Sequence, residues 1–260
     1  ACCRFGPWFG RKISIHTFET CIDHLMYPKC EALKRFLLLQ SRCKQTQSSS
    51  FVYGVQEYES FRAIFGSKKA DFSKDLSFEI TNGNFGVVEG VSGIGKTTLL
   101  NFIAGLKVPQ SGEIILNNKI LSNDDEFVLP EERNIGYVFQ DFALFPHINV
   151  KKNILFASKN KNSDFYSKVT EILKLKSHLQ KMPHELSGGL MQRVAICRAL
   201  MMEPSLLILD EPFSNLDNEN SMNVREILKD YVSEKNIPCL IVSHDTNLFS
   251  DFDSLERIKL

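Results

Sequence analysis

Hydrophobic residues recur along the chain with two spacings, and the spacing predicts where strands and helices lie. Alternation at Leu76, Phe78 and Ile80, and the unbroken apolar runs 206–209 and 240–242, are typical of strands. The unbroken runs predict strands buried on both faces. Between these runs a stripe with helical spacing appears at Val224, Ile227, Leu228, Tyr231 and Val232. The order strand, helix, strand predicts a crossover in a parallel sheet.

The same pattern predicts further elements earlier in the chain. Two or three short strands are expected between Val55 and Ile80, ahead of a turn at 81–84, and another at 85–88. Beyond them the sequence predicts strands at 113–116 and 119–120 that are joined by an Asn117-Asn118 turn, and another at 135–139. Between 141 and 200 the spacing becomes helical, which predicts a helical insertion in an α/β domain.

Residues 1–50 differ in texture from the remainder, because they hold five of the seven cysteines and the only tryptophan. Cys21, His24 and Cys30 match no familiar zinc spacing, and no clean apolar core of a signal peptide is present. We interpret 1–50 as a poorly defined extension, either disordered or not native. Residues 51–260 are the predicted folded domain, with a helical subdomain at about 141–200 and a C-terminal end that is short or truncated.

Composition and charge limit the classes of function that fit this chain. An apolar content of 43% is enough for a buried core, and no run of roughly 18 apolar residues predicts a membrane span. Lys and Arg total 31 and Asp and Glu total 31, so the overall charge gives a nucleic-acid partner no electrostatic support. Cys197 and Cys239 lie within apolar patterns and are expected to be buried free thiols in a reducing compartment.

A glycine-rich stretch lies between a predicted strand and a predicted helix, and it is the first candidate binding motif along the chain. Its pattern G-x-x-x-x-G-K-T predicts a phosphate-binding loop whose backbone N–H groups and helix start attract an anion. Lys96 can reach the β- and γ-phosphates, and the Thr97 hydroxyl can ligate Mg²⁺. The nucleotide-binding residues of this stretch are Gly90, Val91, Ser92, Gly93, Ile94, Gly95, Lys96, Thr97 and Thr98.

Two further stretches add to this loop. Asp210 and Glu211 end a buried strand, where the first carboxylate could hold Mg²⁺ and the second could orient and polarise a water molecule. Ser187, Gly188 and Gly189 precede a predicted helix and form a second candidate phosphate-binding helix start. Taken alone, that tripeptide is only a flexible helix start. Because one chain cannot easily bring both helix starts to one γ-phosphate, we predict that a second subunit supplies Ser187 in trans.

Residues 51 to about 250 resemble the nucleotide-binding domain of ATP-binding cassette (ABC) transporters. The resemblance rests on six motifs in the order and spacing of that family. They are similar to Walker A (90–98), the Q-loop glutamine (Gln140), the signature (186–189), Walker B (206–211), the D-loop (214–217) and the switch histidine motif (242–245). It implies an α/β fold with a P-loop NTPase core of mainly parallel strands flanked by helices, an N-terminal antiparallel β subdomain and an inserted α-helical subdomain.

The resemblance also implies roles for individual residues. Glu211, His244, Gln140 and Lys96 would be catalytic, and Thr97, Gln140 and Asp210 would bind Mg²⁺. Phe65 would stack on the adenine of ATP, with an ordinary core phenylalanine as the less favoured alternative, and Asp217 would couple the two sites of a dimer. Leu190 stands where the family usually has glutamine, which removes one polar contact at the dimer seam. The implied cofactors are ATP and Mg²⁺.

The implied partners are a second copy or a homologous cassette, a membrane permease and a substrate-binding protein, with no nucleic acid. The implied place is the cytoplasmic face of the inner membrane, as a peripheral subunit that powers import. Segments 129–136 and 138–147 resemble import cassettes of the ferric-iron, polyamine, sulfate and maltose type, and ferric iron is the nearest match. The alternatives are an ABC-type ATPase in DNA repair or translation and a non-hydrolysing regulatory subunit. The stretch between Lys96 and Ser187 is too short for the long coiled coil of the repair enzymes.

Overall fold

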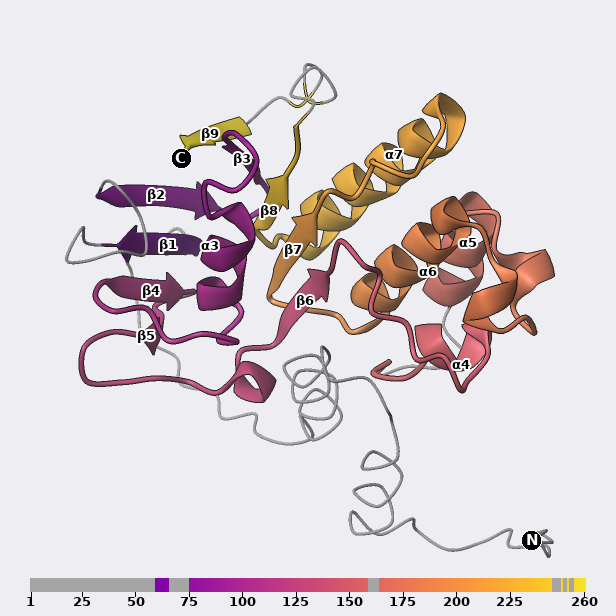
Figure 1. The fold of residues 1–260 in the computed structure, drawn as a ribbon, viewed down its shortest axis with the longest axis horizontal. Helices are drawn as coiled ribbons and strands as arrows, with labels where there is room; N and C mark the ends of the chain where they lie inside the picture. Colours follow the sequence, from indigo (N-terminus) through magenta and orange to yellow (C-terminus); the bar gives the residue numbers. More distant parts are fainter. Residues whose placement is uncertain (1–58, 66–74, 159–163, 245–248, 250–251, 253–254) are drawn as a thin grey trace, which may run out of the picture.

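Two β-sheets with helices around them make up the fold of the computed structural model (Figure 1). The structure describes residues 59–65, 75–158, 164–244, 249, 252 and 255–260. The prediction for residues 1–50, including Cys21, His24 and Cys30, lies outside the described residues. Figure 1 shows the antiparallel sheet at the left and the helical region at the right, with the parallel strands between them.

The larger sheet has five parallel strands in the order β6-β7-β8-β3-β9. Its strands are β3 (Phe85–Glu89), β6 (Ile135–Val138), β7 (Leu206–Asp210), β8 (Cys239–Val242) and β9 (Leu255–Lys259). Successive side chains of β7 point to opposite faces, so Leu207 and Leu209 enter one hydrophobic cluster while Leu206 and Ile208 enter another. The sheet is therefore buried on both faces, as the unbroken apolar runs predict.

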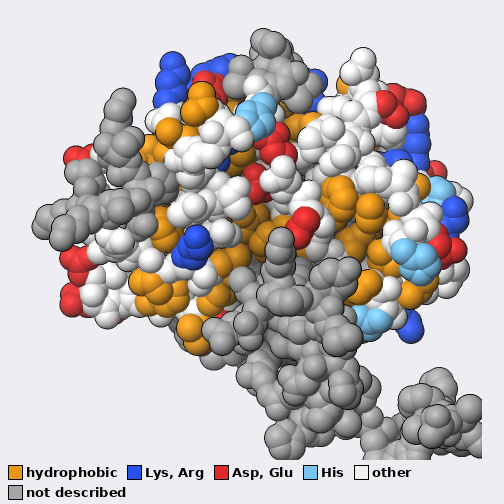
Figure 2. Space-filling view, viewed as in Figure 1, with side chains coloured by type: hydrophobic (Ala, Val, Ile, Leu, Met, Phe, Trp, Pro, Cys, Tyr) orange, Lys and Arg blue, Asp and Glu red, His pale blue; other side chains and the backbone are white. Residues whose placement is uncertain are grey.

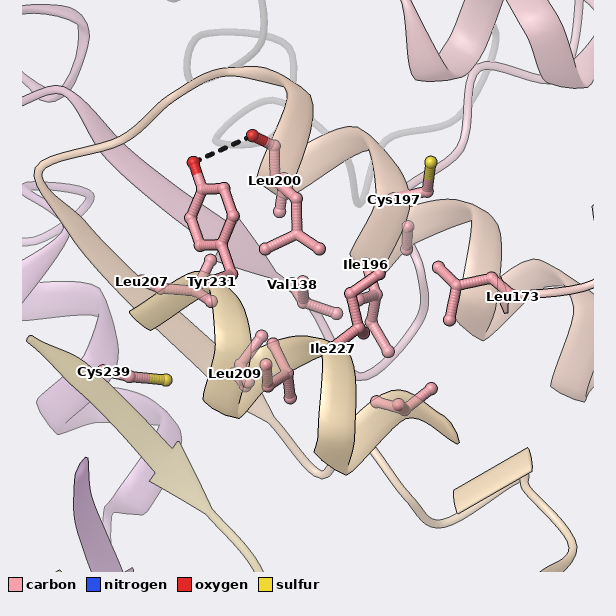
Figure 3. Close-up of a cluster of buried hydrophobic side chains, with 14 of the residues drawn as sticks. Val138, Leu173, Ile196, Cys197, Leu200, Leu207, Leu209, Ile227, Tyr231 and Cys239 are labelled. Atoms are coloured by element: carbon pink, nitrogen blue, oxygen red, sulfur yellow. Dashed lines mark hydrogen bonds between the residues drawn. The ribbon is translucent and has the colours of Figure 1, made fainter. Parts of the chain in front are cut away.

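One face of this sheet is covered by α6 (Gly188–Met201) and α7 (Asn218–Lys235). The apolar stripe predicted for the crossover helix is buried in α7, and the hydroxyl of Tyr231 donates a hydrogen bond of 3.0 Å to the Leu200 carbonyl of α6 (Figure 3). Cys197 and Cys239 are free, fully buried thiols in the same cluster, and burial raises the pKa of both. Their predicted burial is confirmed.

The smaller sheet is antiparallel and has the order β2-β1-β4-β5. It combines β1 (Ser60–Phe65) and β2 (Leu76–Thr81) with β4 (Glu113–Leu116) and β5 (Lys119–Ser122). The predicted Asn117-Asn118 turn joins β4 to β5, with φ of 49° and 61°. The antiparallel subdomain is therefore confirmed, but half of its strands come from the chain that follows the phosphate-binding loop.

Helix α3 (Lys96–Ile103) packs in the second hydrophobic cluster, between the two sheets. The apolar helical pattern begins at Leu99 and predicts a helix that runs to about Leu106, whereas α3 already ends at Ile103. The helix begins after Gly95, whose φ of 110° only glycine adopts readily, and it ends before Gly105, whose φ is 77°. Hydrophobic spacing cannot locate these ends, because backbone conformation at glycine sets them.

The segment 141–200 contains α4 (Val150–Ile154), α5 (Asp164–Ile172) and α6. Single 3-10 turns occur at Pro130–Glu132, Lys176–His178 and Pro183–Glu185. A helical insertion is therefore confirmed in this part of the sequence. Among the helices of the described residues, none is both long and apolar enough to cross a membrane.

Candidate functional site

The loop between β3 and α3 folds around the side chain of Lys96. Gly93 and Gly95 adopt φ of 82° and 110°, and these values let successive N–H groups of the loop face inward. The Lys96 ammonium donates hydrogen bonds to the carbonyls of Gly90 (2.7 Å) and Val91 (3.1 Å). No side chain caps the start of α3, so its N-terminal N–H groups remain suitable for an anion.

The carboxylate of Asp210 lies at the end of β7, opposite the start of α3. It accepts a hydrogen bond of 3.1 Å from the Thr97 hydroxyl, and Asp210 is only 3% exposed. Burial raises the pKa of Asp210, while Thr97 and Lys96 partly offset this rise. A buried carboxylate and a hydroxyl that face each other are hard oxygen donors, and this donor set suits Mg²⁺.

Glu211 follows Asp210 in a strained backbone conformation. Its φ is 52°, which is uncommon for a residue with a side chain, and its N–H donates to the Val242 carbonyl at 3.0 Å. His244 Nε2 lies 3.2 Å from Glu211 Oε1, a buried oxygen that makes no hydrogen bond of good geometry within the described part of the chain. Burial raises the pKa of Glu211, and the nearby imidazole of His244 opposes that rise. An under-satisfied carboxylate oxygen of this kind fits an incoming water molecule.

These groups meet at one hollow of about 260 Å³ at the carboxyl edge of the parallel sheet. Ten predicted residues line it together with Val242: Ser92, Gly93, Gly95, Lys96, Thr97, Thr98, Gln140, Asp210, Glu211 and His244. The predicted loop residues Gly90, Val91 and Ile94 do not line it. Gln140 reaches it from the chain after β6. The structure thus brings one predicted group of catalytic and metal-binding residues together in a single place.

The second predicted group lies outside this hollow. Ser187 caps α6, and its exposed hydroxyl accepts a 3.3 Å hydrogen bond from the N–H of Leu190. Gly189 lies against the neighbouring loop so closely that a Cβ there would stand 2.6 Å from the Asn215 carbonyl oxygen. Ser187, Gly188 and Gly189 do not line the hollow. They form an outward-facing surface of their own.

Asp217 lies beside that surface as the cap of α7. Its carboxylate accepts from the N–H of Asn220 at 2.8 Å, and this hydrogen bond lowers the pKa of Asp217. The carboxylate is exposed and does not line the hollow. Its geometry accounts for the start of α7 and leaves the coupling role of Asp217 as a prediction.

Phe65 lies in the core beside the antiparallel sheet. Its side chain is 2% exposed and packs against Phe102, with ring centroids 5.9 Å apart. Alternation along β1 explains this, because Phe61, Ala63 and Phe65 face the core while Arg62 and Ile64 face outward. Phe65 does not line the hollow, and its role in stacking on adenine stays a prediction.

Two buried polar residues that contact the segment after Gln140 are not predicted by the sequence patterns. Arg198 of α6 is 3% exposed and Asn153 of α4 is fully buried, and both hold backbone carbonyls of the segment that follows Gln140. The only signal for Arg198 is a charge inside the apolar stretch 194–201. Such a charge is rarely buried unless it is paired, so it marks a site that needs structural explanation.

The sequence is similar to those of proteins from one known family. A family model described as ABC transporter matches residues 73–214. The molybdenum import ATP-binding protein ModC of Aliivibrio fischeri is 43% identical over 176 residues, which cover 67% of this chain and 48% of that protein. The Fe(3+) ions import ATP-binding protein FbpC 2 of Pectobacterium atrosepticum is 42% identical over 175 residues, which cover 66% and 51%. This chain therefore spans about half the length of these curated relatives.

A solved structure has a similar fold. It is the dimeric structure of a post-hydrolysis state of the ATP-binding cassette MJ0796, bound to ADP and Pi. It aligns with a TM-score of 0.63 at 27% sequence identity and covers 76% of this chain and 94% of that chain. Both sheets and the helical region described above therefore belong to a known arrangement.

Proposed function

Since this chain belongs to the ABC transporter family, we propose that it binds ATP with Mg²⁺ and hydrolyses the γ-phosphate. The observation that carries this proposal is the single hollow in which Lys96, the Thr97–Asp210 pair and the Glu211–His244 pair converge. Phosphoryl transfer needs charge neutralisation and positioning more than covalent chemistry, and these residues offer both.

Each residue then has a defined task. Lys96 and the loop N–H groups would bind the phosphates, while Thr97, Asp210 and Gln140 would hold Mg²⁺. Bound Mg²⁺ would neutralise charge on the phosphate oxygens. The water oxygen forms a bond to the γ-phosphorus, the bond to the bridging oxygen breaks, and ADP and inorganic phosphate result. Glu211 would orient this water and accept its proton, and His244 would hold Glu211 in place.

We further propose that a second copy completes the site. Ser187, Gly188 and Gly189 do not line their own hollow, so they are available to another chain's nucleotide. The relative MJ0796, 27% identical, is described as dimeric in its solved structure with ADP and Pi, and this supports the proposal. Asp217, next to the signature surface, would couple the two sites.

We propose that the cassette works with a membrane permease, as a peripheral subunit at the cytoplasmic face of the inner membrane. Figure 2 shows hydrophobic side chains exposed over both halves of this face, including the half that carries α4 to α6. Phe142 and Phe145, close to Gln140 in the chain, are half-buried and packed against the two hydrophobic clusters. A permease contact at this place would reach the hollow through Gln140.

Import, with a substrate-binding protein, is the proposed direction because the curated relatives are named as import proteins. The prediction of ferric iron as cargo remains a prediction. The relatives named for molybdenum and for Fe(3+) match at 43% and 42% identity, so similarity does not favour one of them.

Replacement of Glu211 tests the proposed hydrolysis. Glu211→Gln keeps the shape of the side chain and removes its capacity to accept a proton, so the rate should fall on the order of 10²-fold or more. Phosphate release from Mg²⁺-ATP measures this rate, and ATP affinity should change little. The control Glu126→Gln alters an exposed carboxylate far from the hollow. Unchanged turnover in Glu211→Gln would remove Glu211 from its proposed role.

A further inference from the structure

The chain between Gln140 and α4 lacks regular structure and contains two consecutive residues in an uncommon backbone conformation. Phe142 and Ala143 have φ of 64° and 50°, values that residues with side chains adopt only at a cost. The Phe142 N–H donates to the Phe139 carbonyl at 3.0 Å, and the Ala143 N–H donates to the Asp141 carbonyl at 2.7 Å. Surrounding groups must hold a turn of this kind in place.

Arg198 supplies that hold from inside α6. One guanidinium nitrogen donates to the Ala143 carbonyl at 2.7 Å, and another donates to the Phe142 carbonyl at 3.0 Å. The planar guanidinium presents both donors in a fixed geometry, which a lysine cannot reproduce. Burial lowers the pKa of Arg198 to about 10, with Asp141 opposing the shift, so the group stays charged at neutral pH.

Asn153 fixes the other end of the same segment. Its amide nitrogen donates to the carbonyls of Phe145 (3.1 Å), Ile148 (3.0 Å) and Asn149 (3.2 Å), and its oxygen accepts from the Phe145 N–H at 2.8 Å. The segment is thus tied to α4 at one end and to α6 near Gln140. Of these two ties, only Arg198 connects it to the helix that begins at Ser187.

Helix α6 therefore has functional surfaces at both ends. It begins at the signature residues, which do not line their own hollow, and Arg198 lies ten residues after Gly188. At 1.5 Å per residue this separation is about 15 Å along one continuous helix. A displacement of the signature end moves Arg198 with it, and Arg198 grips the backbone two and three residues after Gln140.

We propose that Arg198 is a positioning residue that couples the signature surface of one chain to the placement of Gln140 in the same chain. When Ser187 engages the nucleotide of a second copy, α6 shifts, and Arg198 carries the shift to the turn at Phe142 and Ala143. Each site of a dimer thereby senses whether its chain has engaged the other site. This inference rests on the proposed ATP-dependent dimer.

Hydrogen exchange of the turn tests the coupling in the full chain carrying Glu211→Gln, with and without Mg²⁺-ATP. ATP should slow exchange in peptides that cover 139–147 and 90–98. With Arg198→Lys added, the amides of Phe142 and Ala143 should exchange roughly tenfold faster in the ATP state, because the guanidinium no longer holds the carbonyls of these two residues and the turn opens more often. Protection at 90–98 should remain. Unchanged protection of 139–147 in the Arg198→Lys chain overturns the inference.

Arg133→Lys is the matched control for loss of a buried arginine. Arg133 is 2% exposed and donates to the carbonyls of Phe102 (3.0 Å), Ile103 (2.7 Å) and Leu121 (3.1 Å). It precedes β6, whereas Gln140 follows β6, so the control lies at the opposite end of that strand. Arg133→Lys should lower the Tm and keep the ATP-dependent protection of 139–147. Loss of this protection in both variants would indicate general destabilisation and overturn the inference.

Ser187→Arg gives a second test if Arg198→Lys does not fold. The position is exposed, so the larger side chain can be accommodated while it obstructs a partner. ATP should still protect 90–98 but should no longer slow exchange at 139–147. Full protection of 139–147 in this variant overturns the coupling. Failure of the proposed function looks different, because ATP would then protect neither segment in the parent chain.

Discussion

Two helices of this chain, α3 and α6, begin beside glycines, and their surroundings differ. The start of α3 has no side-chain cap and opens on a hollow lined by Thr97, Asp210, Glu211 and His244. The start of α6 is capped by its own Ser187 and lines no part of that hollow. A helix start is therefore not enough to make a phosphate site, and in the proposed dimer a second chain would supply the nucleotide that the start of α6 contacts.

The largest expected effect is on the Kd for Mg²⁺-ATP, which should respond very differently to substitutions at the two helix starts. Lys96→Ala removes the positive charge of the hollow, so the Kd of a single chain for Mg²⁺-ATP should rise roughly 10- to 100-fold. Ser187→Arg should leave that single-chain Kd within about twofold, because Ser187 lies outside the hollow. Binding of a fluorescent ATP analogue at low protein concentration measures both.

Lys107→Ala, an exposed lysine just beyond α3, is the control for loss of charge. It should leave the Kd unchanged. If Lys96→Ala and Ser187→Arg weakened the binding of Mg²⁺-ATP equally, the result would contradict the assignment of single-chain nucleotide binding to the hollow and not to the surface around Ser187.

A smaller effect should appear in stability, because only the α3 side contains a buried carboxylate. The pKa of Asp210 is higher in the folded chain than in the unfolded chain, so the charged form favours unfolding. This loss of stability is fully present at pH values above the raised pKa of the folded chain. It disappears at pH values below the ordinary pKa of a carboxyl group. Asp210→Asn should therefore raise the Tm of the nucleotide-free chain at pH 7 by about 1–3 °C.

Thermal unfolding between pH 4 and pH 8 checks the sign. The gain from Asp210→Asn should shrink as the pH falls, since the wild-type carboxyl then becomes neutral as well. Asp217→Asn is the contrasting control, because a hydrogen bond from Asn220 lowers the pKa of Asp217, and this variant should not raise the Tm. A gain from Asp210→Asn that grows toward low pH would contradict burial as the cause.

The comparison also explains how far sequence reasoning reaches. The residues themselves mark Lys96 as part of a phosphate-binding loop and Asp210 and Glu211 as carboxylates at the end of a strand, whereas the place of His244 is implied only by the family resemblance. The structure brings all four to one edge of the parallel sheet. Apolar runs such as 206–209 likewise predict burial on both faces.

Other positions depend on facts that hydrophobic spacing does not contain. Phe65 faces the core because of how β1 alternates and pairs, with Phe65 opposite Leu76 of β2. The ends of α3 follow backbone angles at Gly95 and Gly105. The grip of Arg198 on the turn after Gln140 joins residues more than fifty positions apart and needs the folded chain to be seen.

ATP-dependent dimerisation tests the composite site most directly. The mass in solution of the Glu211→Gln chain is measured by light scattering with Mg²⁺-ATP, against the same chain carrying Ser187→Arg. The first should reach twice the chain mass of 29.6 kDa, and the second should bind ATP equally well and stay at the mass of one chain. Equal dimerisation of both chains, or a Glu211→Gln chain that binds ATP and stays single, would contradict completion of the site by Ser187 to Gly189 of a second copy.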